Sequence, residues 1–546
     1  MSKIVGIYAI PDTSNAEYPS LIHDHNLTIM EDGKIVSYVH QERISRKKYD
    51  ATLQNELRNF TRAFDLFNDD DLHFVFTDHE IGRSVLSAVG DMRFEAPLNS
   101  ELSNGLEDAR LFWFGKHYKA FILNHELAHL YSCVPFYGMF EPNSLLVHFD
   151  GGASKSNFSA WRYHQGEVEL LEAHYDLKWI SSLFNANALV FAIVQAKMKH
   201  QNAVPGKFMG LEAFGTYRTE IEEWLKQHNY FTDCWSSKKL FYAAAKKCFG
   251  VELSQIDNRN QFIQDISATI HEIFIRESLK VFNRLQNITG AKTLYYSGGS
   301  ALNIKLNSRI VNSGLFERVC IPPCTSDSGL SIGAATALSI QQGIEVSMSN
   351  PYLNNFKLNS EFEIKPELLE AVAGLVKNNK VVGICNGFAE AGPRALGNRS
   401  IIARADYKKL AERISREHKK REWYRPIAPI MLPHNFTYFT GKHDFPELAV
   451  YMLAEFSILD DKLSEIEGCV HQDGTSRIQV LEEKSFNPFM YSLLDFLDRN
   501  HQVKALVNTS FNRQGEPIVH TAKEALASAK VMELDAVVIN GELTVL

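Results

Sequence analysis

Two histidines four residues apart are the clearest sign of chemistry in this 546-residue chain. The stretch LNHELAHLY (residues 123–131) is predicted to be helical, and its spacing places His125 and His129 on one helical face, with Cβ atoms about 5 to 6 Å apart. A strand-like run, SLLVHFD, ends in Asp150, and Asp327 lies in a later turn rich in serine and glycine. Two imidazoles with carboxylates suit Fe²⁺, Mn²⁺ or Zn²⁺, so these four residues are candidate metal ligands.

The same residues have other interpretations. The helix spells His-Glu-x-x-His, the pattern of zinc metalloproteases, in which Glu126 would be the general base. No residue downstream resembles the third ligand of such an enzyme, and a protease would leave the phosphate-binding features without a role. Alternatively, the histidines are ordinary structural residues and Asp327 is a helix N-cap.

Glycine pairs follow two buried, strand-like runs. Gly151-Gly152 comes directly after Asp150, and Gly298-Gly299 ends KTLYYSGG ahead of a predicted helix. Glycine lets the backbone approach a phosphate, and the amides of the next helix offer hydrogen-bond donors. The recurrence of the pair predicts a nucleotide cleft between two α/β lobes.

The most basic stretch of the chain runs from Arg394 to Arg425. It carries eleven lysines and arginines against four acids, a net charge of +7 in a chain whose formal charge is −8. Glycines and prolines hold Arg394 and Arg425 in turns, where guanidiniums suit planar anions such as phosphates. Residues 408–420 also fit one amphipathic helix with a solvated charged face, with Leu410 and Ile414 inward.

Farther along, small polar residues and one arginine add to this predicted phosphate site. The strand ALVNTSF ends in Asn508, Thr509 and Ser510, which suit either phosphate oxygens or turn capping. Arg477 is predicted to lie on the strand RIQVL and to point to one of its faces.

Length and composition describe a soluble globular protein. The length predicts two or three domains, and a polar stretch near residues 341–360 is the expected linker between domains at 1–345 and 346–546. Seven scattered cysteines without a CxxC pair, and no run of eighteen apolar residues, predict a cytoplasmic protein without a membrane span. Mild acidity argues against nucleic acid as the main partner.

Eleven motifs, taken in order, resemble those of the O-carbamoyltransferases of antibiotic and nodulation-factor biosynthesis, the NodU/CmcH family. They span nearly the whole chain. The motifs are HD (23–24), EDGKIV (31–36), ERISRKKYD (42–50), NHELAH (124–129), FDGG (149–152), GGSALNIKLN (298–307), SDSGLSIGAA (326–335), GPRALGNRSI (392–401), KKREWYRPIAP (419–429), HQDGTSRIQV (471–480) and VNTSFNRQGEPIV (507–519).

The resemblance implies an α/β protein with an actin/hexokinase-like (ribonuclease H-like) N-terminal domain and a YrdC-like C-terminal domain. It also implies an enzyme that converts carbamoyl phosphate and ATP to carbamoyl-adenylate and pyrophosphate, and then carbamoylates a hydroxyl of a small natural-product acceptor. The implied cofactors are ATP with Mg²⁺ and a divalent metal, with Fe²⁺ favoured.

Site residues follow from the resemblance position by position. The implied iron ligands are His125, His129, Asp150 and Asp327. His23 would face the acceptor hydroxyl as the catalytic base, and Lys48 would contact nucleotide phosphates. The implied contacts for carbamoyl phosphate and the nucleotide are Arg394, Lys419, Arg425, Arg477, Asn508, Ser510, Gly151, Gly152, Gly298, Gly299 and Asn303.

Four positions depart from the family pattern, and two other functions of the same fold stay open. Glu126 stands where many members have a second adjacent histidine, Tyr49 and Ala391 replace a common histidine and a common aromatic residue, and GGASKS replaces the usual loop after Asp150. The other functions are a threonylcarbamoyl-type enzyme acting on tRNA and an ATP-dependent switch protein. Loop 11–22 is an expected acceptor wall.

Overall fold

The computed structural model describes residues 3–10, 22–66, 71–78, 82–87, 90–113 and 115–546. Most of the loop expected to form an acceptor wall, residues 11–21, lies outside this description.

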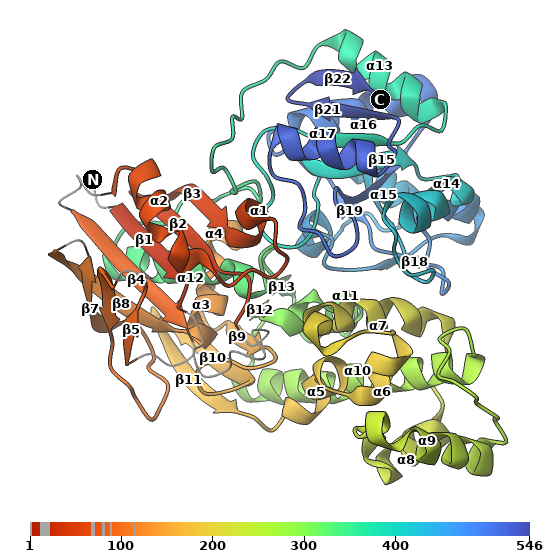
Figure 1. Ribbon diagram of the computed structural model, residues 1–546, viewed down its shortest axis with the longest axis horizontal. Coiled ribbons are helices and arrows are strands. Elements are labelled where there is room, and N and C mark those ends of the chain that lie inside the picture. Colours follow the sequence, from red (N-terminus) through yellow and green to blue (C-terminus); the bar gives the residue numbers. More distant parts are fainter. Residues whose placement is uncertain (1–2, 11–21, 67–70, 79–81, 88–89, 114) are drawn as a thin grey trace.

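The first sheet is formed by the start of the chain. Its strands are β1 (Lys3–Tyr8), β2 (Asn26–Glu31), β3 (Lys34–His40), β4 (Leu72–Asp78), β5 (Arg83–Val85), β6 (Met92–Glu95), β7 (Glu107–Trp113) and β8 (Lys116–Asn124). Within the described ranges their order is β3-β2-β1-β4-β8-β7-β6-β5 (Figure 1). β2 is antiparallel to β1 and β3, whereas β1, β4 and β8 run parallel. The first five strands have the order and directions of the actin/hexokinase-like core, so this prediction is confirmed.

Side chains of β1 alternate between two buried clusters. Ile4 and Tyr8 belong to the cluster that includes helices α3 (His125–Tyr131) and α12 (Leu330–Gln341), whereas Val5 and Ile7 belong to the cluster on the opposite face. Because successive side chains of a strand point to opposite faces, a strand covered on both sides is apolar throughout, as KIVGIY is.

Helix α3 directly follows β8 and begins at His125, two residues later than the predicted helical stretch. Asn124 is its N-cap, and the Asn124 side chain accepts a hydrogen bond from the Leu127 amide at 2.8 Å. Such a cap satisfies one of the free amides at the start of a helix. It therefore fixes where the helix begins and which face the two histidines share.

Helix α12 crosses α3 and β1 at close range because small residues face the crossing. A Cβ at Gly333 would collide with the carbonyl oxygen of Ala128, and a Cβ at Gly6 would collide with that of Ser331. The short helix η7 (Asp327–Gly329) leads into α12. The crossing therefore brings Asp327 to α3 from about two hundred residues away in sequence.

The second sheet carries both glycine pairs. Its strands are β9 (Leu145–Phe149), β10 (Phe158–His164), β11 (Glu167–His174), β12 (Thr293–Ser297) and β13 (Arg318–Cys320). The order found among described residues is β11-β10-β9-β12-β13, and β9 runs parallel to β12. Because parallel strands end at the same edge, Asp150 and Gly299 emerge side by side.

Helices fill the chain between β11 and β12. They are α5 (Lys178–Asn185), α6 (Ala188–Ile193), α7 (Val204–Leu211), α8 (Thr219–Gln227), α9 (Cys234–Phe249) and α10 (Gln261–Thr289), and α11 (Ile304–Asn312) follows β12. Helices α8 and α9 project from the rest of the molecule (Figure 1).

The C-terminal part is built around a third, mixed sheet. Its strands are β14 (Val382–Cys385), β15 (Arg399–Arg404), β16 (Ala428–Met431), β19 (Gln479–Val480), β20 (Ala505–Ser510), β21 (Ala536–Ile539) and β22 (Glu542–Val545), in the order β19-β16-β20-β15-β14-β21-β22. Helices α13 (Pro366–Lys377) and α16 (Pro488–His501) share a buried cluster with this sheet. The predicted α/β class is confirmed, whereas the specific likeness to YrdC stays a prediction.

Two local predictions for this part were wrong. Residues 408–420 are not one α-helix, because α14 (Lys408–Arg413) continues as a π-helical turn (Ile414–His418), although Leu410 and Ile414 are buried as predicted. Arg477 does not lie on a strand. It sits between β18 (Thr475–Ser476), which pairs with β17 (Phe456–Ser457), and β19, which pairs with β16. The chain changes sheets at this point.

The expected linker is held in place by hydrogen bonds on both sides. The backbones of Asn354 and Ala389 exchange two hydrogen bonds of 3.0 Å, while the Asn355 side chain bonds to Ser37 at 2.7 Å and to the Val36 carbonyl at 2.8 Å. The segment therefore pairs with β3 and with the C-terminal part at once.

Candidate active site

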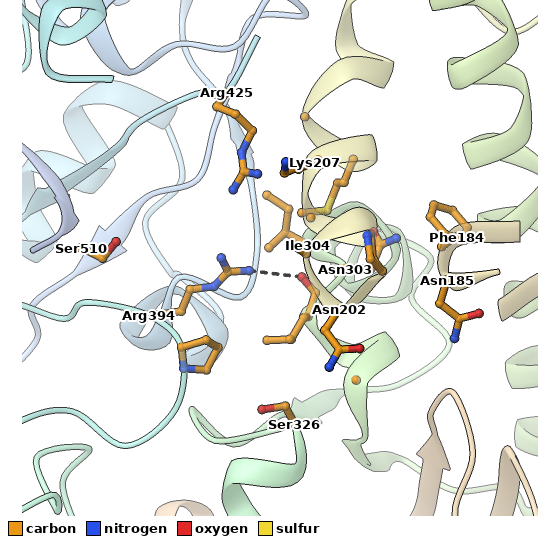
Figure 2. Close-up of a pocket in the computed structure, with 18 of the residues that line it drawn as sticks. Phe184, Asn185, Asn202, Lys207, Asn303, Ile304, Ser326, Arg394, Arg425 and Ser510 are labelled. Carbon is orange, nitrogen blue, oxygen red and sulfur yellow. Dashed lines mark hydrogen bonds between the residues drawn. The ribbon is translucent and has the colours of Figure 1, made fainter. Parts of the chain in front are cut away.

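One cavity joins the N-terminal and C-terminal parts of the chain. Its volume is about 1370 Å³, and its lining includes His23, Asp150 and Asp327 from the first part and Arg394 and Arg425 from the second. Figure 2 shows Arg394, Arg425 and Ser510 facing residues of the helical region, among them Lys207, Asn202 and Asn303. The acidic and basic candidate sites therefore open into a common space.

The four candidate metal ligands lie together at one end of this cavity. The Nε2 atoms of His125 and His129 are 3.0 Å apart, and Asp327 Oδ1 lies 3.7 Å and 3.5 Å from them. Asp150 Oδ2 is 3.6 Å from His129 Nε2. Both imidazoles are fully buried behind the two carboxylates.

These separations fit a single cation. Nitrogen and oxygen ligands bind first-row metal ions at about 2.0 to 2.2 Å, which puts neighbouring donor atoms roughly 3 to 3.5 Å from one another. His129, Asp150 and Asp327 form one such group of three. Burial raises the pKa of Asp327, but the imidazoles of His23 and His125 outweigh it and hold the pKa well below its usual range. The Asp327 carboxyl group is therefore ionised at neutral pH.

His23 lies beside this cluster. Its Nδ1 is 3.1 Å from Asp24 and 3.9 Å from Asp327, and Asp24 also contacts the His40 imidazole at 3.2 Å. Burial lowers the pKa of His23, but the carboxylates of Asp327 and Asp24 outweigh it and raise the pKa to about 10. These two carboxylates therefore favour the imidazolium form of His23.

Glu126 does not take the position that a zinc protease requires. Its Oε1 accepts hydrogen bonds from the amides of Lys155 and Ser156 at 2.8 and 3.1 Å, and from the Ser156 hydroxyl at 3.2 Å. The fully buried carboxylate thus holds the loop after Asp150 instead of activating water at the histidines. The metalloprotease interpretation is inconsistent with this geometry.

Glycines of both pairs contact the side chain of Asp150 in this structure. The amides of Gly151 and Gly299 both donate to its carboxylate. Gly298 has a φ of 110°, and a Cβ there would collide with the Phe149 carbonyl, so only glycine suits the position. Gly151, Gly152 and Gly299 line the cavity, whereas Gly298 does not.

Asn303 lines the cavity at the start of α11. Its Oδ1 caps the helix by accepting from the Leu306 amide at 3.1 Å, and its Nδ2 is 2.9 Å from His271 Nε2. The side chain is thereby fixed in the orientation that Figure 2 shows.

Guanidiniums gather at the other end of the cavity. Burial and the neighbouring Arg425 lower the pKa of Arg394 to about 10. Burial and the guanidinium of Arg394 likewise hold the pKa of Arg477 well below its usual range. Like charges this close disfavour one another, so the arrangement favours a bound anion.

Arg421 belongs to this group and was not singled out from the sequence. It lines the cavity and donates to the Ser510 hydroxyl at 3.3 Å, and burial together with Arg425 lowers its pKa to about 9. Its position in KKREWYRP, four residues before Arg425, could have identified it from the sequence.

Four other predicted phosphate contacts differ in their positions. Lys419 does not line the cavity: it is 1% exposed, and its ammonium donates to the carbonyl oxygens of Ser510 and Asn512. Asn508 lines the cavity but gives its amide hydrogens to Gln479 and Ala395 at 2.6 and 3.2 Å. Ser510 and the exposed Lys48 line it with groups that can reach a ligand.

Models of one protein family match both parts of the chain. The model described as Carbamoyltransferase N-terminus matches residues 104–336, and that described as Carbamoyltransferase C-terminus matches residues 373–545. The chain belongs to the carbamoyltransferase family. The predicted enzyme class, a carbamoyltransferase, is thereby confirmed.

Curated relatives agree with the family. Nodulation protein U of Sinorhizobium fredii strain NGR234 is 33% identical over 305 residues, which cover 53% of this chain and 51% of the relative. A protein of Methanocaldococcus jannaschii, MJ1051, is 28% identical over 73% of this chain and 79% of its own length. The chain thus spans about half the length of the nodulation protein.

Among solved structures, full-length HypF in the phosphate- and nucleotide-bound form matches with a TM-score of 0.31 and 13% identity, over 63% of this carbamoyltransferase and 56% of that chain. A likeness this weak adds nothing to the topology given above.

Within the described ranges, no helix is both long and apolar enough to cross a lipid bilayer.

Proposed function

We propose that this carbamoyltransferase uses ATP and carbamoyl phosphate to carbamoylate a hydroxyl group of a small-molecule acceptor. The observation that supports it is the single cavity shared by a carboxylate-imidazole cluster and a guanidinium cluster. Residues 346–546 would form the activating domain and residues 1–345 the transfer domain. An intermediate made at one end would then reach the other without leaving the protein.

The first step would take place among the guanidiniums. Carbamoyl phosphate reacts with water to give carbamate and inorganic phosphate, and a carbamate oxygen then attacks the α-phosphorus of ATP. The bond to the β-phosphate breaks, and carbamoyl-adenylate and pyrophosphate form. Arg394, Arg421, Arg425 and Arg477 would stabilise the negative charge that builds up on the phosphates, because guanidiniums bind planar phosphate oxygens through paired hydrogen bonds.

The second step would take place at the carboxylate-imidazole cluster. The acceptor oxygen attacks the carbamoyl carbon, the bond to AMP breaks, and the hydroxyl proton passes to His23. A divalent cation held by His125, His129, Asp150 and Asp327, with Fe²⁺ favoured, would polarise the carbamoyl carbonyl and offset the charge of the carboxylates. Once that charge is offset, the His23 imidazole can accept a proton, and Asp24 stabilises the imidazolium that results.

The test is an analysis of products from the purified protein with carbamoyl phosphate, Mg²⁺ and ATP labelled at the α-phosphate. We expect labelled AMP or carbamoyl-AMP together with pyrophosphate. Release of ADP and phosphate would point instead to an ATP-dependent switch protein and would overturn the proposal.

The acceptor can be sought in the same reaction. A mixture of candidate alcohols, analysed by mass spectrometry, should yield a product in which one carbamoyl group replaces one hydrogen. A carbamoylated nucleoside in tRNA, with no modified small molecule, would favour the tRNA-modifying alternative.

A further inference from the structure

His148 is a buried imidazole that the proposed mechanism leaves without a role. It lies on β9, two residues before Asp150, and it has no exposed surface. Because side chains two residues apart along a strand share a face, His148 and Asp150 both point toward α3. An imidazole in the otherwise apolar run LLVHF is costly to bury unless its nitrogens have partners.

Its ring lies against the two histidines of α3. The ring centroids of His148 and His129 are 5.2 Å apart with 25° between their planes, and those of His148 and His125 are 6.2 Å apart. One ring nitrogen from each of the three residues lies within 4.8 Å of the others. The three imidazoles therefore form a buried group that could hold a metal ion.

A serine orients the His148 ring. Ser159 faces His148 across the β9–β10 ladder, and its hydroxyl is 3.2 Å from His148 Nδ1. Histidines that bind metals are commonly held through one ring nitrogen while the other points to the ion. With Nδ1 held by Ser159, the ring would coordinate through Nε2.

We propose that His148 is a third imidazole ligand of the metal centre, beside His125, His129 and the two carboxylates. This inference rests on the proposed metal site and extends it. Three nitrogen donors favour Fe²⁺, Co²⁺ or Zn²⁺ over the oxygen-preferring Mg²⁺ and Ca²⁺. The centre would therefore keep its transition metal in the presence of the Mg²⁺ that accompanies ATP.

The test measures Co²⁺ binding to the full chain by competition with a chelator and by visible absorption. His148→Phe keeps an aromatic ring against His129 but removes both nitrogens, so we expect binding weakened about 10- to 100-fold and a changed spectrum. The matched control is His174→Phe, a histidine of β11 in the same sheet that stacks on Phe158, and it should bind as the wild type does.

Two further variants distinguish failure of the whole metal centre from failure of the third ligand alone. His129→Ala should lose Co²⁺ binding altogether, so equal binding by this variant and the wild type would overturn the metal centre and the third ligand together. If His129→Ala loses binding but His148→Phe keeps the affinity and spectrum of the wild type, only the third ligand is overturned. Should His148→Phe not fold, His148→Gln retains a partner for Ser159 and is measured instead.

Discussion

The two ends of the cavity differ in the charges that face one another. At the end that holds the candidate metal ligands, called the metal end below, imidazoles and carboxylates face one another at 3.1 to 3.9 Å, and each stabilises the charge of its neighbour. At the other end, guanidiniums face guanidiniums, and burial together with this repulsion lowers their pKa values. The first group is therefore stable before any ligand arrives, whereas the second is under repulsion that an anion would relieve.

The two ends also differ in what holds their side chains. His125, His129 and Asp327 stand on helices, and Asp150 ends a buried strand. Arg394, by contrast, lies between Gly392 and Gly397, which have φ values of 83° and 126°, and Arg477 lies where the chain changes sheets. Changes at either end should therefore alter stability, because they remove attraction between charges at the first end and repulsion at the second.

The largest effect should come from His23→Asn. This variant removes the proposed base at the metal end, and general base catalysis contributes about 10²- to 10⁴-fold to rate, so carbamoyl transfer should fall by that factor. Pyrophosphate release, which depends on the other end of the cavity, should not change. Both rates can be followed in one reaction by pyrophosphate assay and product mass spectrometry.

His40→Asn is the control, because His40 also contacts Asp24 but does not line the cavity. It should reduce transfer far less. If His23→Asn left transfer intact, or if it abolished both steps together, the assignment of separate roles to the two ends would fail.

The next effect should come from Arg394→Met, which removes one guanidinium from the activating end. Loss of a single group that stabilises charge in the transition state costs about 10²- to 10³-fold in rate, so pyrophosphate release should fall by that amount and transfer should fall in parallel. Lys409→Met is the matched control, since Lys409 is an exposed cation of the same basic stretch. Equal rates for the two variants would show that overall charge, and not the position of Arg394, matters.

Much of the metal end could be predicted from the sequence because its signals are local. The four-residue spacing of His125 and His129 acts within one helix, and Asp150 ends a strand whose apolar run is contiguous. His148 was missed for the same reason, since within that run it looked like a core residue. Its proposed role depends on the packing of β9 against α3, and a pattern within one segment does not show how two segments pack.

The cationic end was predicted less completely because contacts between distant segments decide which charges face inward. Lys419 turns away from the cavity because the loop at Ser510 and Asn512, about ninety residues later, supplies carbonyl oxygens for its ammonium. Arg421 was overlooked among the neighbouring charges of the basic stretch, directly after the segment predicted to be one helix. The sequence predicted a strand at Arg477, because the alternation of side chains along a strand does not show where the chain passes from one sheet to another.

A smaller effect should follow from Arg421→Gln, and it tests the repulsion directly. Removing one clustered cation should stabilise the protein without ligand, by on the order of 1 kcal/mol because solvent screens this half-buried group. The apparent melting temperature should rise by about 2 °C. Pyrophosphate should raise the melting temperature of the wild type more than that of the variant.

Glu422→Gln serves as the opposite control, because it removes an acid that contacts Arg425 at 4.0 Å and should destabilise the unliganded protein. A lower melting temperature for Arg421→Gln without ligand would contradict the idea that this end is under repulsion.

The last effect concerns the pH dependence of stability and contrasts two histidines. Carboxylates raise the pKa of His23, whereas burial, reinforced by Arg399, Arg43 and Arg46, lowers the pKa of His520 to about 3. His520 is 2% exposed and its Nε2 donates to the Phe356 carbonyl at 2.8 Å. Between pH 6.5 and 3 the unfolded chain therefore binds a proton at this residue that the folded protein does not. Stability from this group is complete above pH 6.5 and falls as the pH is lowered.

His520→Gln should remove this dependence, because glutamine keeps a donor for Phe356 and does not titrate. The wild type should be the more stable protein at pH 7, and its advantage should shrink by roughly 2 to 3 kcal/mol on going to pH 4.5, measured by urea unfolding. His443→Gln, at an exposed histidine of the same part of the chain, should show no such change. A difference between wild type and His520→Gln that stayed constant with pH would mean that the arginines around His520 do not keep it neutral, and the contrast with His23 would be lost.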